Sequence, residues 1–177
     1  MKKIFWIFFF LIFVNPLGKV FADQDNGFPD PVLFRIGYME GIGGTVGDKG
    51  ALAGGFEYQF FQDVNQAVSV SFEEFIDRGA DLANRPLTPL FINYRLYTGS
   101  EPLSGFYFSV GAGVAMPWGP WHGGGSLAWQ GSVGFASSGG GFLEFRYVGR
   151  PKKTLVYNGI PFQLHNTFVG IETGATF

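Results

Sequence analysis

The stretch GFYFSVGAGVA at residues 105–115 alternates between two kinds of side chain. Its even-numbered positions are apolar and include two phenylalanines, whereas its odd-numbered positions are mostly glycine, serine and tyrosine. A period of two places successive side chains on opposite faces of a β-strand. The stretch therefore predicts a strand with one large, apolar face and one small, mostly polar face.

The same alternation recurs along most of the chain, and no segment has a 3.6-residue period long enough to predict a helix. Each segment has about the length that a tilted membrane strand needs. In each segment, every second position, which we call one parity of the strand, mostly carries a large aliphatic or aromatic side chain. The positions between them, the other parity, carry mainly glycine, serine and charged residues. We expect eight strands at residues 32–40, 51–61, 66–73, 89–97, 105–115, 126–136, 141–148 and 163–177.

The composition of the 177-residue chain limits the classes of protein to which it can belong. It contains 28 Gly, 22 Phe, 7 Tyr and 4 Trp, and only 15% of its residues are charged, against about 25% in a typical soluble domain. The absence of Cys excludes a disulfide scaffold, a thiolate metal site and a Cys nucleophile. With a formal net charge of −2, the chain lacks the excess of basic residues that is typical of nucleic-acid-binding proteins.

The first residues have the pattern of a secretory signal peptide. Two lysines precede the apolar run IFWIFFFLIFV at residues 4–14, and Val20-Phe-Ala22 follows at the spacing that a signal peptidase reads. The run is too short for a transmembrane helix, which needs about 20 apolar residues. We expect a cleaved signal peptide at residues 1–22 and one barrel domain at residues 23–177.

Alternating strands fit two architectures. A soluble sandwich or barrel turns its apolar face inward, whereas a membrane barrel turns it toward lipid. The small, glycine-rich polar face suits a narrow lumen, and the aromatic face suits the girdles at the two edges of a bilayer. The expected connections also alternate between long and short, as they do in outer-membrane barrels. We therefore predict an all-β, eight-stranded, antiparallel, closed transmembrane β-barrel.

Two segments resemble those of a known group of proteins. The terminal stretch TFVGIETGATF at residues 167–177 and the stretch GGFLEFRY at residues 140–147 resemble the last two strands of small outer-membrane barrels of the OmpA transmembrane-domain and opacity types. The resemblance implies a bacterial outer-membrane location with lipid around the barrel. It also implies that Phe177 belongs to an assembly signal read by the barrel-assembly machinery.

Six of the charged residues on the polar parity lie in what we expect to be the lower, periplasmic half of the lumen. Buried charges must be paired and hydrogen-bonded, and an eight-stranded barrel is just wide enough for its side chains to fill. We therefore expect an ion-pair network that plugs the lumen, with a gated polar conduit as the alternative. Its members are Arg35, Glu57, Arg95, Glu144, Arg146 and Glu172.

The sequence offers few groups for other chemistry. The glycine-rich loop at residues 41–50 lacks the Lys-Ser/Thr pair and the helix of a phosphate-binding loop. With two His, no Cys and no acidic cluster beside them, we expect no metal and no cofactor. Trp118, Trp121 and His122 form an aromatic loop patch, which we interpret as an interfacial anchor, with a ligand-contact patch as the alternative.

One set of residues has the parts of a catalytic site. His165 and Thr167 share the lipid-facing parity of the last strand, and Glu40 ends the lipid-facing parity of the first, so a base, a hydroxyl and an acid could meet there. The set faintly resembles lipid A deacylase barrels, with Thr in place of Ser. Interface residues are the favoured interpretation, and we expect a structural or loop-mediated surface role. The alternatives are a lipid-modifying enzyme, a narrow channel and a soluble periplasmic lipid-binding barrel.

Overall fold

The computed structural model of the chain describes residues 31–42, 50–77, 87–117, 125–152, 154–157, 160–163 and 167–176. Within these ranges no helix is long and apolar enough to cross a membrane. The described residues form ten strands: β1 (Val32–Ile42), β2 (Ala51–Asp63), β3 (Gln66–Asp77), β4 (Leu87–Tyr97), β5 (Gly105–Pro117), β6 (Ser126–Ala136), β7 (Phe142–Gly149), β8 (Thr154–Tyr157), β9 (Ile160–Gln163) and β10 (Thr167–Thr176).

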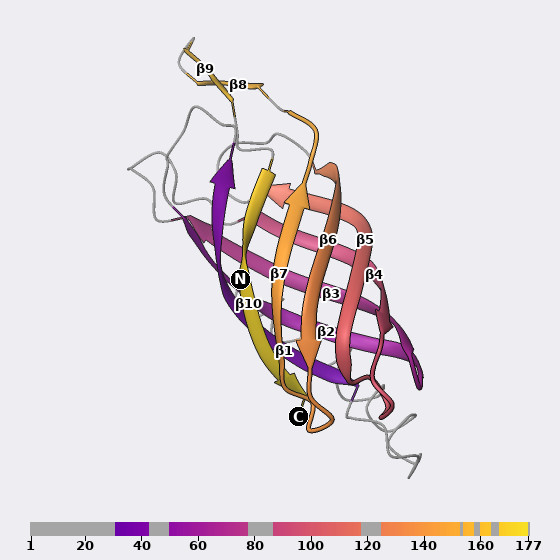
Figure 1. The fold of residues 1–177 in the computed structure, drawn as a ribbon. Helices are drawn as coiled ribbons and strands as arrows, with labels where there is room; N and C mark the ends of the chain where they lie inside the picture. Colours follow the sequence, from indigo (N-terminus) through magenta and orange to yellow (C-terminus); the bar gives the residue numbers. More distant parts are fainter. Residues whose placement is uncertain are drawn as a thin grey trace, which may run out of the picture.

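Eight of these strands close into one antiparallel barrel, which confirms the predicted fold class. The order around the barrel is β1-β10-β7-β6-β5-β4-β3-β2, so the first and the last strands pair and close it. The strands β8 and β9 pair with each other as a separate hairpin, which rises beyond one end of the barrel (Figure 1).

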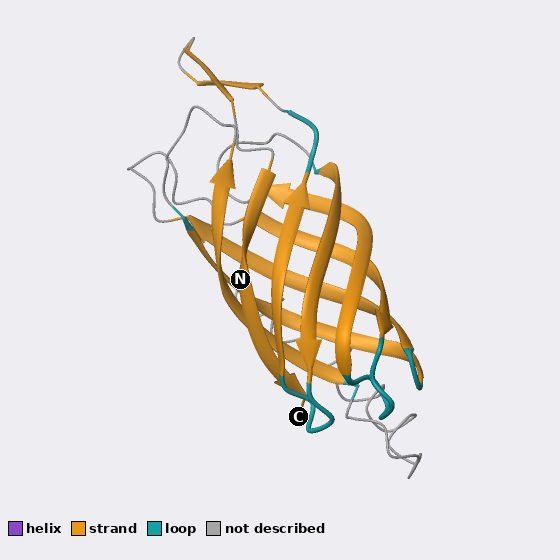
Figure 2. Cartoon of the chain, in the orientation of Figure 1, coloured by secondary structure: helices purple, strands orange, loops and turns teal. Residues whose placement is uncertain are grey.

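The two ends of the barrel differ in their connections. The short connections β2–β3, β4–β5 and β6–β7 lie at the end where β1 starts and β10 finishes, and Figure 2 shows them together there. We call this the turn end. The opposite end, from which the hairpin β8–β9 projects, is the loop end.

Several strands extend further than the alternation predicts. The strand β3 continues to Asp77 rather than residue 73, because Phe75 keeps the inward parity although it is apolar. The last barrel strand, in contrast, begins at Thr167 rather than at residue 163, which belongs to the hairpin. The hairpin lies in the stretch between the last two expected strands, where the sequence Asn158-Gly159 is a strong turn signal.

The outward surface of the barrel is apolar on all eight strands. On β5, Phe106, Phe108 and Val110 each expose more than 60% of their surface, whereas the inward Tyr107 exposes 1%. Large exposed apolar side chains occur on each barrel strand, for example Ile36, Phe56, Ile76, Ile92, Phe108, Leu127, Phe145 and Ile171. The barrel is therefore apolar outside, the reverse of a water-soluble barrel.

The seam between β1 and β10 depends on a close backbone approach at Gly170. A Cβ atom there would lie 2.0 Å from the carbonyl oxygen of Tyr38 and 2.6 Å from the sulfur of Met39. The backbone of β10 would have to move away from β1 to make room, at the seam that closes the barrel.

We predict that Gly170→Ala lowers the free energy of unfolding by about 1–3 kcal/mol, the usual cost of overpacking. The measurement is the urea midpoint of the folded protein in detergent. Gly139→Ala is the control, because the nearest atom to a Cβ at Gly139 is 3.9 Å away. Equal midpoints for the two variants would contradict the close approach at the seam.

Candidate functional site: the charged layer of the lumen

Seven charged side chains of the described residues lie in the lumen, each at most 2% exposed. They come from β1, β2, β3, β4, β7 and β10, and each occupies the inward parity of its strand. The six residues predicted from the sequence lie together here, and Glu73 is a seventh that the prediction missed. We call this set the charged layer: Arg35, Glu57, Glu73, Arg95, Glu144, Arg146 and Glu172.

Arg35 is the centre of the charged layer. Its guanidinium donates through Nη2 to Oε2 of Glu172 at 2.8 Å, and through Nε to the same oxygen at 3.2 Å. It also forms ion pairs with Glu57 and Glu144. One arginine on β1 thus contacts carboxylates from β2, β7 and β10.

The other two arginines extend the network. Arg95 donates through Nη2 to Oε2 of Glu57 at 2.6 Å. Arg146 donates through Nη1 to Oε2 of Glu172 at 2.8 Å and also pairs with Glu73. Because Glu57 and Glu172 are each shared between two arginines, the three cations belong to one connected cluster.

Neutral polar side chains supply further hydrogen bonds to the carboxylates. The hydroxyl of Ser69 donates to Glu57 at 2.6 Å. The hydroxyls of Tyr107 and Ser132 both donate to Glu144, at 2.6 and 3.0 Å. Hydrogen bonds that favour the charged form of a carboxylate offset part of the cost of its burial.

Apolar side chains seal the charged layer on both sides along the barrel axis. The loop-end seal consists of Met39, Ala51, Ala53, Phe75, Phe91, Ala115, Ala128, Val148 and Phe168. The turn-end seal consists of Leu33, Ala67, Tyr97, Leu103, Tyr107, Ala136 and Phe142. The charges therefore lie between two apolar layers.

The strand β7 shows this order in its own sequence. On β7 the inward positions run from Phe142 through Glu144 and Arg146 to Val148. Aromatic rings of both seals also face the cations, since the guanidinium of Arg35 lies 5.3 Å from the ring centre of Phe142 and that of Arg146 lies 5.7 Å from that of Phe91. Such cation–π contacts stabilise a desolvated cation.

The charged layer holds one surplus negative charge, because four glutamates face three arginines. Glu73 is the least engaged of the four. Its Oε1 has no hydrogen-bond partner among the described residues and lies 3.9 Å from Nε of Arg35. The sequence put Glu73 on the polar parity, as the last residue of its expected strand, but the predicted network did not include it.

The other candidate residues are not brought together in the part of the chain that the structure describes. Glu40 lies opposite Val169, whereas Thr167 lies opposite Ile42. The carboxylate of Glu40 accepts a hydrogen bond from the hydroxyl of Tyr38 on its own strand, at 3.0 Å. Outside the described residues lie the predicted signal peptide, Trp118, Trp121, His122, His165 and Phe177.

No group of three or more His, Cys, Asp or Glu side chains with metal-binding geometry occurs among the described residues. One further buried cation, Arg150, lies just beyond the end of β7 and outside the barrel strands. Burial lowers the pKa of Arg150 to about 10. At neutral pH this side chain is still charged, so the loop end of β7 carries a buried positive charge.

No protein-family model matches the chain, and no curated protein matches it. Among solved structures, the chain is similar to one described as "De novo design of transmembrane beta-barrels". The TM-score is 0.50 and the identity is 10%, over 83% of this chain and 97% of that one. At this identity the similarity concerns the fold, and it agrees with the closed antiparallel barrel.

We predict that Arg146→Met destabilises the barrel by about 3–5 kcal/mol, because it leaves buried carboxylates without their cation. Adding Glu172→Gln should restore only part of the loss, since Glu73 also pairs with Arg146. Urea unfolding of the single and double variants measures both effects. A single variant as stable as the parent would show that the layer is hydrated and screened.

A second prediction concerns the surplus charge. Glu73→Gln removes one negative charge while its amide oxygen can still accept from Arg146, so we expect an unchanged or higher urea midpoint. Glu172→Gln is the matched comparison and should lower the midpoint, because Glu172 is shared between two arginines. Equal losses from the two variants would argue against a surplus charge at Glu73.

Proposed function

We propose that the chain is an integral protein of the bacterial outer membrane, with a barrel that spans the bilayer and a lumen plugged by the charged layer. The observation that carries the proposal is the inverted polarity of the barrel: apolar side chains outside, ion pairs inside. Soluble monomers seldom expose apolar patches larger than a few hundred Å². An apolar band that encircles a barrel is typical of a surface in contact with membrane lipid.

Aromatic side chains support this placement. Near the turn end the outward surface carries phenylalanines, including Phe60, Phe106 and Phe135. Nearer the loop end it carries Tyr38 and Trp129. Rings at both ends of an apolar band are typical of barrels whose aromatic girdles lie at the two membrane interfaces. The soluble lipid-binding barrel is disfavoured, because its apolar face would line the lumen.

The charged layer favours a plug over a channel. Its arginines all make ion pairs, and apolar seals lie on both of its sides. Ions would have to break these pairs and cross both seals to pass. We therefore propose a structural role in the membrane or contact with partners through the loops, rather than conduction.

We also propose how the protein reaches the membrane. Residues 1–22 would direct export, and Phe177 would end an assembly signal for the barrel-assembly machinery. This support comes from the sequence pattern at the two ends of the chain. No observation among the described residues favours the lipid-modifying alternative.

Membrane fractionation combined with cysteine labelling tests the proposal, because the natural chain contains no Cys. The protein should be found in the outer-membrane fraction, resist extraction with sarkosyl and migrate differently on a gel after heating. Cys at residue 48 or 158 should react with an impermeant maleimide on intact cells, whereas Cys in place of Asp63 or Ser138, at the turn end, should react only after lysis.

Each outcome separates the alternatives. Equal labelling of both sets on intact cells would overturn the orientation, and recovery in the soluble periplasmic fraction would overturn the membrane location. In planar bilayers the purified protein should give no stable, discrete conductance steps. Such steps would favour the channel.

A further inference from the structure

One side chain in the turn-end seal does not come from a barrel strand. Leu103 belongs to the β4–β5 connection, and it is only 3% exposed. It belongs to the same buried cluster as Leu33, Tyr97, Tyr107 and Phe142, whose side chains come from the strands. In contrast, every described residue of the loop-end seal belongs to a barrel strand. The β4–β5 connection therefore supplies part of the apolar seal at the turn end.

The backbone of Leu103 has φ = 50°, and no other non-glycine residue in the described ranges has a positive φ. This conformation disfavours residues with a Cβ atom, so glycine or asparagine is usual there. A leucine at such a position is held by its surroundings at a conformational cost. A leucine at this position is therefore explained by its side chain, which is buried in the turn-end seal, and not by the backbone conformation.

One backbone hydrogen bond joins Leu103 to the neighbouring turn, and another lies within the connection itself. The backbone N–H of Leu103 donates to the carbonyl of Val64 in the β2–β3 turn, at 3.0 Å. The N–H of Gly99 donates to the carbonyl of Ser104 at 2.9 Å. Neither bond belongs to the barrel ladder, so Leu103 can leave the seal without unpairing a strand.

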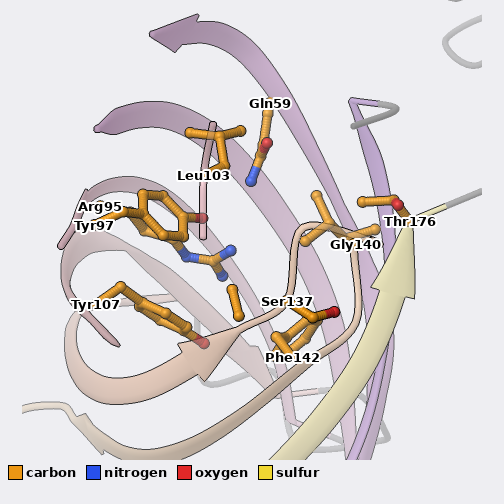
Figure 3. Close-up of a pocket in the computed structure, with 11 residues that line it drawn as sticks. Gln59, Arg95, Tyr97, Leu103, Tyr107, Ser137, Gly140, Phe142 and Thr176 are labelled. Carbon is orange, nitrogen blue, oxygen red and sulfur yellow. The ribbon is translucent and has the colours of Figure 1, made fainter. Parts of the chain in front are cut away.

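A small cavity of about 20 Å³ lies beside Leu103. Figure 3 shows the guanidinium of Arg95 pointing into it, with the rings of Tyr97 and Tyr107 on one side and Gln59 opposite. The Nε of Arg95 is buried and has no hydrogen-bond partner among the described residues. A cavity of this size holds about one water molecule where polar groups line it.

We propose that the turn end is the water inlet of the lumen, with Leu103 as its displaceable stopper and a water bound to Arg95 in the cavity behind it. When Leu103 withdraws, water and small solutes reach the charged layer from this end alone. Among the described residues the loop-end seal has no counterpart of Leu103, because Met39, Phe75, Phe91 and Phe168 all belong to barrel strands. The inference rests on the plugged lumen of the proposed function.

The test uses single cysteines in the natural Cys-free chain. Ser109→Cys is the reporter, since Ser109 is 6% exposed and lies opposite Arg95 on the inward face of β5. Leu103→Gly removes the stopper, and glycine adopts the positive φ without strain. The purified, folded protein in detergent is treated with methyl methanethiosulfonate, a small neutral thiol reagent.

We expect Leu103→Gly to raise the labelling rate of Ser109→Cys by about tenfold or more, since the apolar contacts that hold the seal closed are lost. Glu101→Ala, an exposed change in the same connection, should leave the rate unchanged. A cysteine in the loop-end seal, Ala128→Cys, should remain protected in all backgrounds. Leu103→Ala is the second variant, for use if Leu103→Gly does not fold.

An unchanged rate in a folded Leu103 variant would overturn the stopper and leave the plug standing. Labelling of Ala128→Cys as fast as that of Ser109→Cys, after removal of Leu103, would overturn entry from one end. Rapid labelling of Ser109→Cys with Leu103 in place would show an open lumen, and would overturn both the stopper and the proposed plug.

Discussion

Arg35 joins three glutamates from three other strands, and the interior of the barrel is organised around this contact. Glu57, Glu144 and Glu172 approach it from β2, β7 and β10. The strands β2 and β10 also pair directly with β1, whereas β7 is joined to β1 by this contact without pairing with it. A slip of one residue in a strand that carries one of these charges would turn the charge toward the outer surface. Buried ion pairs are weak evidence for stability. Here, however, they distinguish the observed register of the strands from registers shifted by one residue.

The polarity of the rest of the barrel is consistent with this core. Polar and charged groups occupy the middle of the lumen, so the outward positions are left to large apolar side chains such as Phe108 and Ile92. Within the lumen, apolar layers at both ends keep water from the charges. The described residues of the loop-end layer all belong to strands, whereas the turn-end layer includes Leu103 from the β4–β5 connection. The two layers therefore differ in the elements that supply them.

The period-two pattern was sufficient to predict the closed barrel and the inward parity of the charged residues. It failed where an inward position is apolar, as at Phe75, because the expected strand then ended at residue 73 instead of Asp77. Glu73 was expected on the inward parity but was not included in the ion-pair network. The partners of each arginine could not be predicted, since they lie across the lumen and depend on strand order and stagger. The role of Leu103 could not be predicted either, because nothing in a loop leucine indicates a positive φ or burial in the barrel end.

The most direct test of the inverted polarity is methyl-detected NMR of the folded protein in detergent micelles. Nuclear Overhauser effects between the acyl chains of the detergent and the protein's methyl groups report which side chains touch the apolar surroundings. The account predicts strong effects at Ile92, Val110 and Leu127, which face outward, and none at Val148 and Leu33, which lie in the seals of the lumen. Effects at Val148 and Leu33 with none at Ile92 and Val110 would contradict it.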